Sequence, residues 1–211
     1  MILEIFPSGP FLTNAILLGC ATTKKGVFID PSPGSAPLLI DAAKKHGLAI
    51  IAIFLTHSHL DHIGDLSILK EKYKVPVYVH PLDAENVENP GSDGLSLFLP
   101  VLPVIPDKFF EEGQQLMVGL LEVKVIHTPG HSPGGVCFYI EKEYILISGD
   151  TLFNGSIGKI SFPSSSPNAM WKSLKKLAKL PPETRVYPGH GEPTTIGAET
   201  WLDNAEKIFG G

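Results

Sequence analysis

The stretch Thr56-His57-Ser58-His59-Leu60-Asp61-His62 decides the fold, because it places four potential metal ligands directly after an apolar run. That run, Ala49 to Leu55 (AIIAIFL), has the length and β-branched content that predict a strand buried on both faces. Side chains two apart in extended chain point the same way, so His57 and His59 are expected to bind one ion. The turn beyond them swings Asp61 and His62 toward a second ion, and two ions within ~4 Å is the arrangement of hydrolytic two-metal sites.

Three further ligand candidates follow later in the chain, each directly after a glycine. They are His131 in TPGHSPGG (128–135), Asp150 in SGDTLF (148–153) and His190 in YPGHG (187–191). Glycine tolerates the sharp turns that let a short side chain reach an ion. Alone, each residue fits a turn cap or a core hydrogen bond equally well, whereas the whole set favours a metal site. We assign His57, His59 and His131 to one ion, Asp61, His62 and His190 to the other, and Asp150 as the bridge.

This donor set predicts two divalent metal ions per chain. Imidazole nitrogen and carboxylate oxygen, without thiolate, suit zinc, and also iron or manganese. A hydroxide held between two ions needs no protein base, because coordination lowers the pKa of water from about 15.7 to about 7. Asp61, which would orient that hydroxide, and the bridging Asp150 are the predicted catalytic residues.

The bulk properties restrict the class of protein. A chain of 211 residues with 43% hydrophobic and 18% charged residues predicts one globular domain over residues 1–211. The net charge of −5 without a basic stripe argues against nucleic-acid binding. We expect a cytoplasmic protein, since neither a signal peptide nor an apolar run of ~20 residues is present. Cys20 and Cys137, far apart in sequence, are expected to be buried, reduced thiols.

Short strands and helices interleave along both halves of the chain. Helices are predicted at Ala36 to His46, around Ile63 to Tyr73, from Pro167 with Ser166 as N-cap, and from about Ile196 to Phe209. Strands are predicted at 12–18, 26–30, 49–55, 75–79, 116–118, 120–127, 136–140, 144–148 and 185–187. Each half contributes ligands and neither holds a complete site, which predicts an α/β fold with two layers of sheet covered by helices.

The segment from Asn89 to Pro106 differs from the rest, because its four prolines exclude a regular helix or a central strand. Its apolar residues fit a lid over the site, a dimer contact or an extended segment packed on the core.

The remaining histidines are interpreted structurally: His46 as a cation at a helix end, His80 as a strand-end residue, and His127 as a core residue or one that supports a ligand. Asp30 after Val27-Phe28-Ile29 is a better candidate for supporting a ligand imidazole, although a turn-forming Asp before Pro31 fits equally.

At these motifs the chain resembles the metallo-β-lactamase superfamily, and within it the glyoxalase II (hydroxyacylglutathione hydrolase) branch. The resemblance covers nearly the whole chain. It implies a four-layer αβ/βα sandwich with two mixed β-sheets, a dinuclear site in the cleft between them, and hydrolysis of a small-molecule thioester such as S-lactoylglutathione. Authentic β-lactamases lack an aspartate bridge at the place of Asp150, so antibiotic hydrolysis is not expected.

The run from Gly149 to Lys159 also resembles the glyoxalase branch, in which a cation at the place of Lys159 helps to hold the glutathione carboxylate. A solvated loop lysine is the alternative. Two departures concern the substrate: Ser161 stands where larger relatives have a tyrosine, and the chain ends about twenty residues after His190. We therefore expect the short glyoxalase II-like form, without the helical C-terminal domain.

Two other classes of activity remain open. Persulfide dioxygenases resemble this scaffold but use a single iron. In this chain His57, His131 and Asp150 would hold that iron. Lactonases and phosphodiesterases use comparable ligands. The run Gly155-Ser156-Ile157-Gly158-Lys159 favours the thioester hydrolase.

Overall fold

The first half of the chain forms a mixed six-stranded sheet. The computed structural model describes residues 1–210. The sheet order follows the sequence: β1 (Ile2–Ser8), β2 (Thr13–Gly19), β3 (Lys25–Ile29), β4 (Ala49–Phe54), β5 (Val77–Val79) and β6 (Lys108–Phe109). β1 to β3 pair antiparallel, and β3 to β6 pair parallel. The parallel part is built by crossovers through α1 (Ala36–His46), α2 (Leu66–Tyr73) and α3 (Pro81–Glu88).

The second half forms a second mixed sheet of six strands. Its order is β12 (Thr194–Thr195), β11 (Arg185–Pro188), β10 (Ile145–Gly149), β9 (Val136–Ile140), β8 (Leu121–His127) and β7 (Gln115–Val118). β7 to β10 form an antiparallel meander, whereas β10 and β11 are parallel because α4 (Pro167–Leu177) connects them. The short helices are η1 (Glu141–Glu143), η2 (Leu202–Asn204) and α5 (Ala205–Phe209).

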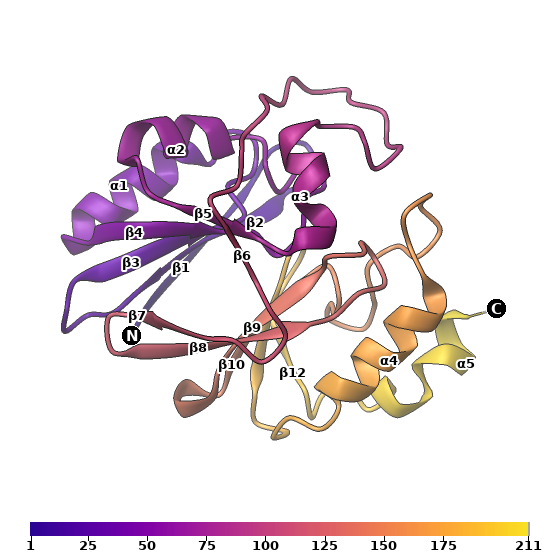
Figure 1. Ribbon diagram of the computed structural model, residues 1–211. Helices are drawn as coiled ribbons and strands as arrows, with labels where there is room; N and C mark the ends of the chain where they lie inside the picture. Colours follow the sequence, from indigo (N-terminus) through magenta and orange to yellow (C-terminus); the bar gives the residue numbers. More distant parts are fainter. Residues whose placement is uncertain (211) are drawn as a thin grey trace.

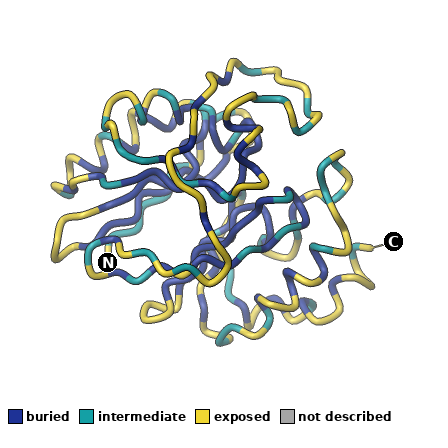
Figure 2. Tube along the Cα trace, viewed as in Figure 1, coloured by how far each residue is buried: buried dark blue, intermediate teal, exposed yellow. Residues whose placement is uncertain are grey.

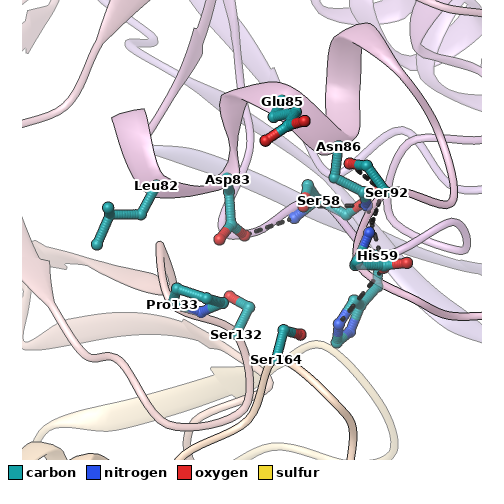
Figure 3. Close-up of a pocket in the computed structure, with 11 residues that line it drawn as sticks. Ser58, His59, Leu82, Asp83, Glu85, Asn86, Ser92, Ser132, Pro133 and Ser164 are labelled. Carbon is teal, nitrogen blue, oxygen red and sulfur yellow. Dashed lines mark hydrogen bonds and ion pairs between the residues drawn. The ribbon is translucent and has the colours of Figure 1, made fainter.

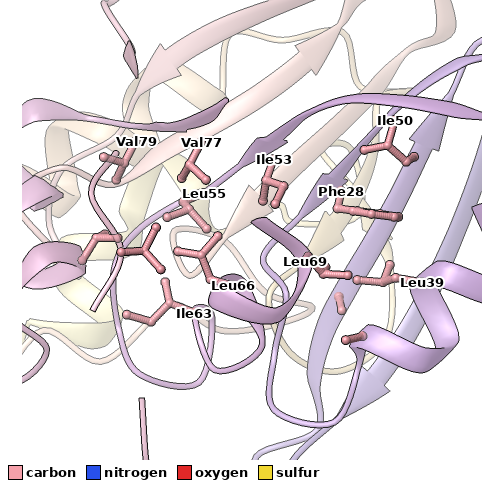
Figure 4. Close-up of a cluster of buried hydrophobic side chains, with 14 of the residues drawn as sticks. Phe28, Leu39, Ile50, Ile53, Leu55, Ile63, Leu66, Leu69, Val77 and Val79 are labelled. Carbon is pink, nitrogen blue, oxygen red and sulfur yellow. The ribbon is translucent and has the colours of Figure 1, made fainter. Parts of the chain in front are cut away.

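Three apolar layers hold these elements together, which confirms the four-layer sandwich. The first lies between α1, α2 and the first sheet, where Phe28, Leu39 and Leu69 pack together (Figure 4). The second fills the space between the sheets, and the third joins the second sheet to α4 and α5. Figure 1 shows the helices on the two outer sides, and Figure 2 shows the buried strands between them. Each sheet is therefore covered on both faces.

Several predicted elements agree closely with the structure. α1 ends at His46 before Gly47, whose φ of 62° gives the left-handed C-cap. α4 begins at Pro167, and the Ser166 hydroxyl accepts a hydrogen bond from the Ala169 N–H at 3.3 Å. Local capping chemistry was sufficient to place both helices.

The predicted C-terminal helix from Ile196 was wrong in extent, since regular helix begins only at Leu202. The Glu199 carboxylate accepts hydrogen bonds from Trp201 Nε1 at 2.6 Å and from the Gly155 N–H at 3.0 Å. The bond to Gly155 joins residues distant in sequence and holds the turn between Thr195 and Glu199 in place. The prediction also missed α3 and β1. α3 is short, and His80 caps it by accepting from the Leu82 N–H at 3.3 Å.

Residues 89–106 connect α3 to β6 without regular secondary structure, as predicted. Val101 and Val104 are buried in the outer apolar layer, while Phe98, Leu102 and Ile105 are exposed. The second half of the segment is therefore anchored to the core by its buried valines, whereas residues beside them such as Leu102 and Ile105 are exposed to solvent (Figure 2). Among residues 1–210, none of the helices has the length and apolar character needed to span a membrane.

The outer apolar layer makes a direct stability prediction on α1. Leu39 is fully buried, whereas the adjacent Leu38 is 44% exposed. Leu39→Ala should lower the free energy of unfolding by about 2–5 kcal/mol, because it leaves a cavity between α1 and the sheet. Leu38→Ala is the matched control and should change it by less than about 1 kcal/mol. Equal effects of the two variants in urea unfolding would contradict the described packing.

Candidate metal centre

The loop after β4 is fixed by the end of the neighbouring strand β3. Asp30 has a φ of 49°, and its carboxylate accepts hydrogen bonds from the Thr56 N–H at 2.7 Å and the Thr56 hydroxyl at 2.6 Å. The same carboxylate accepts from Nδ1–H of His62 at 2.9 Å. Asp30 therefore supports a ligand imidazole, as the sequence suggested. It orients the ring so that Nε2 points into the site.

The structure brings together all seven predicted ligands. His59 Nδ1 lies 2.8 Å from His131 Nε2, and His190 Nε2 lies 3.3 Å from Asp61 Oδ2. The Asp150 carboxylate lies between these pairs, 3.3 Å from His131 Nε2 and 3.4 Å from His62 Nε2. Three sets of donor atoms converge: His57, His59 and His131; His57, His62 and Asp150; Asp61, His62 and His190.

The donor atoms have the character of a metal site rather than of a hydrogen-bonded core. Within residues 1–210, His57 Nε2, His62 Nε2 and Asp150 Oδ1 are buried without a hydrogen-bond partner. Each such buried group costs about 1–3 kcal/mol when nothing satisfies it. Nitrogen and oxygen donors that converge at 2.8–3.4 Å fit divalent ions. The residues present therefore fit the metal that the sequence predicts.

Hydrogen bonds on the side away from the metal centre fix the orientation of the His131 and His190 rings. His131 Nδ1–H donates to the Lys159 carbonyl at 2.7 Å, and His190 Nδ1–H donates to the Phe11 carbonyl at 3.1 Å. Each ring thereby presents Nε2 to the site. These contacts tie the centre to two loops that also line the adjoining cleft.

The charge state of the site differs between its two sides. Burial, with the neighbouring imidazoles, lowers the pKa of His57 and brings that of His59 to about 3, so both rings are neutral at pH 7. Burial also opposes protonation of His62, but Asp61, Asp150 and Asp30 raise its pKa well above the usual value. A neutral imidazole is the form that binds a metal ion. The carboxylates concentrate negative charge beside His62, where a cation is stabilised.

Two glycines allow the ligands to approach one another. Gly149 has a φ of 47°, in the left-handed region. A Cβ on Gly189 would overlap Asp150 Oδ1 and lie 2.8 Å from His62 Cε1. A side chain at Gly189 would therefore displace Asp150 and His62, and one at Gly149 would meet the Thr56 side chain beside His57.

Asp83 on α3 connects the two ligand-bearing loops, and sequence reasoning missed it. Its carboxylate accepts from the Ser58 N–H at 3.0 Å and from the Gly134 N–H at 2.6 Å. Figure 3 shows Asp83 between Ser58 and the loop that carries Ser132, at the side of a polar cavity of about 190 Å³. The only signal in the sequence was an acidic residue in the first turn of a helix, which is common without any site.

The other candidate residues lie outside the centre. His46 contacts Glu4 at the end of α1, and His80 stacks on His127 with ring centroids 4.0 Å apart. Cys20 and Cys137 are buried, free thiols, as expected, and burial raises the pKa of Cys137 to about 11.

A cleft of about 530 Å³ opens over the centre. His59, Asp61, His131, Asp150 and His190 form its floor. Lys159 lies on its wall, with Nζ 4.7 Å from the ring centroid of Phe162. The position of Lys159 suits contact with a bound anion. Its role in binding substrate stays a prediction.

Comparison with known proteins places this fold and site in a family. The model of the metallo-beta-lactamase superfamily matches residues 8–190. Hydroxyacylglutathione hydrolase GloC of Haemophilus influenzae is 32% identical, over 94% of this chain and 95% of its own. This chain belongs to the metallo-beta-lactamase superfamily, and its relatives place it among the metallo-hydrolases.

Two solved structures are similar over nearly their full length. The B3 metallo-beta-lactamase BLEG-1 has a TM-score of 0.86 and 38% identity, covering 94% of this chain and 96% of its own. TTHA1623, solved in a di-iron-bound form, has a TM-score of 0.78 and 41% identity, covering 95% and 98%.

Removing the charge of Asp30 tests the support of the metal ligands. Asp30→Asn should weaken binding of Zn²⁺ by about 10–100-fold, because an amide holds the His62 ring less strongly. Asparagine also tolerates the left-handed backbone at this position. Competition with a chelating dye measures the affinity.

Asp41→Asn is the matched control, because the Asp41 side chain is 78% exposed on α1. The affinity of the Asp41→Asn variant for Zn²⁺ should equal that of the unaltered protein. Unchanged affinity in Asp30→Asn would show that Asp30 does not support the site.

Proposed function

We propose that the protein hydrolyses an acyl thioester of the S-lactoylglutathione type, with two divalent ions held at the candidate metal centre. One observation carries this proposal: seven donor side chains converge in three overlapping sets, and five of them form the floor of an open cleft. The similarity to a hydroxyacylglutathione hydrolase supports a thioester substrate.

His57, His59 and His131 would hold one ion, Asp61, His62 and His190 the other, and Asp150 would contact both. When bound, the ions would polarise the acyl carbonyl, stabilise the developing negative charge and lower the pKa of water. Zinc suits these donors, and iron or manganese are the alternatives. The similarity to a protein with two irons supports a two-ion site.

Asp61 would orient the attacking water. Its Oδ2 accepts a hydrogen bond from Thr13 Oγ1 at 2.7 Å, which fixes the carboxylate. Burial raises the pKa of Asp61, but His62 and His190 outweigh it and hold the pKa below the usual range. The ionised carboxylate faces the cleft and would accept a hydrogen bond from a water there. Lys159 would contact an anionic group of the substrate.

A β-lactam is the second candidate substrate, because a protein with 38% identity bears the name of a B3 metallo-beta-lactamase. Its hydrolysis also requires attack on a polarised carbonyl. The expectation that the Asp150 bridge excludes this activity is therefore tested directly by including a β-lactam in the assay.

The metal-loaded protein should hydrolyse S-lactoylglutathione or another acyl thioester. The double variant Asp61→Ala/His62→Ala should lower kcat/KM on the order of 10²–10³-fold, because it removes two donors of one set. Release of thiol, followed with a thiol reagent, measures the rate.

The control variant Asp41→Ala/Lys44→Ala changes an exposed pair on α1 and should keep full activity. Circular dichroism establishes that both variants are folded. Thioester hydrolysis no faster than in the double variant would refute the proposal. Hydrolysis of a β-lactam alone would favour the second candidate, and one iron per chain with oxygen uptake in the presence of a persulfide would identify a dioxygenase.

A further inference from the structure

We infer that, among acyl thioesters, the cleft favours those with an apolar acyl group, such as a medium-chain alkyl or an aryl group, over those with a small hydroxyacyl group such as lactoyl. This inference rests on the proposed thioester hydrolysis and names the substrate class for that site. It follows from the walls of the cleft and not from its metal ligands.

Apolar side chains from four separate segments surround the floor of the cleft: Phe11, Leu60, Leu95, Phe98, Phe153 and Phe162. Aromatic rings continue down to the ligand imidazoles. Phe162 lies with its ring centroid 5.4 Å from that of His59, and Phe153 lies 5.9 Å from His190. The apolar surface therefore begins directly beside the atoms that would contact the reacting carbonyl.

Phe11 and Phe98 form the outer part of this wall. Their ring centroids are 5.4 Å apart at an interplanar angle of 88°, an edge-to-face pair. They remain 50% and 56% exposed. Two large aromatic rings that stay half in water beside a cleft gain stability when an apolar group covers them. The adjoining metal centre identifies that group as part of the substrate.

Polar partners for a substrate are few in this cleft. Apart from the metal ligands, Ser96 and Lys159 are the polar residues that line it among residues 1–210. A hydroxyl on the acyl group would lose its hydrogen bonds to water on binding, and the described residues of the walls offer it no dedicated hydrogen-bond partner. The one cation that residues 1–210 place in the walls, Lys159, can pair with one anionic group of the substrate. The walls therefore favour an alkyl or aryl substituent next to the carbonyl.

Phe98 is held over the cleft by a segment whose ends are anchored. Asn86 on α3 accepts from the Gly91 N–H at 2.9 Å and donates from Nδ2 to Asp93 at 3.1 Å. At the other end, the Val104 N–H donates to the Val87 carbonyl at 3.0 Å. The sequence did not decide whether residues 89–106 form a lid, a dimer contact or a segment packed on the core. In the structure they supply a wall of the cleft and also pack on the core.

The first test is a series of glutathione thioesters with acetyl, butanoyl and hexanoyl groups, together with S-lactoylglutathione. Each added methylene that enters the cleft should raise kcat/KM roughly fourfold. Hexanoyl should therefore exceed both acetyl and lactoyl. A flat series, or one that favours lactoyl, would overturn the inference while leaving thioester hydrolysis intact.

The second test removes the outer wall. Phe98→Ala and Phe11→Ala should each reduce the hexanoyl-to-acetyl ratio of kcat/KM by about fivefold or more, because the end of the chain loses its contact. Leu102→Ala is the matched control: Leu102 is 64% exposed on the same segment and does not line the cleft. Its ratio should be unchanged. An unchanged ratio in both phenylalanine variants would also overturn the inference.

Binding of free carboxylates separates this inference from the proposed function. Hexanoate should bind the metal-loaded protein at least tenfold more tightly than acetate in calorimetry, and Phe98→Ala should reduce that difference. If no thioester is hydrolysed, the proposed function fails, and the carboxylate series still decides the inference. Equal affinity for acetate and hexanoate would contradict it.

Discussion

The structure depends on bringing five imidazoles and two carboxylates, most of them buried, to one point between two sheets. Such groups are costly to remove from water unless each is paired. Here the outer ring nitrogens of His62, His131 and His190 are paired by Asp30 and by backbone carbonyls, whereas the inner atoms face one another. Bound divalent cations would satisfy the inner atoms, and without them the converging donors would be a source of instability. Metal binding would thus stabilise the fold as well as supply the chemistry.

Because neither sheet carries all the ligands, the two halves must be held in register. Three contacts do this beside the site. Asp83 accepts from Ser58 and Gly134, Val136 N–H donates to the Thr56 carbonyl at 2.8 Å, and Asn14 N–H donates to the Gly189 carbonyl at 2.7 Å. Each joins a residue next to one ligand with a residue of the other half. Errors in sheet packing would therefore be transmitted directly to the ligand positions.

The sequence was sufficient to predict those features that depend on residues close together in the chain. The candidate ligands were identified because histidine and aspartate follow short apolar runs at a tight spacing, and α1 and α4 were placed by their caps. Asp83 and Asn86 were missed because their roles arise only when α3 packs beside the histidine loop. The C-terminal helix was extended too far because Glu199 accepts a hydrogen bond from Gly155, which is distant in sequence. The aromatic walls were likewise invisible, since Phe11, Phe98, Phe153 and Phe162 share no sequence pattern.

The most direct test of this account is anomalous diffraction from crystals of the metal-loaded protein, measured on both sides of the metal absorption edge. The account predicts two peaks, one enclosed by His57, His59 and His131 and the other by Asp61, His62 and His190, with Asp150 between them. Peaks elsewhere, or a site in which either group of side chains contacts no metal, would contradict it.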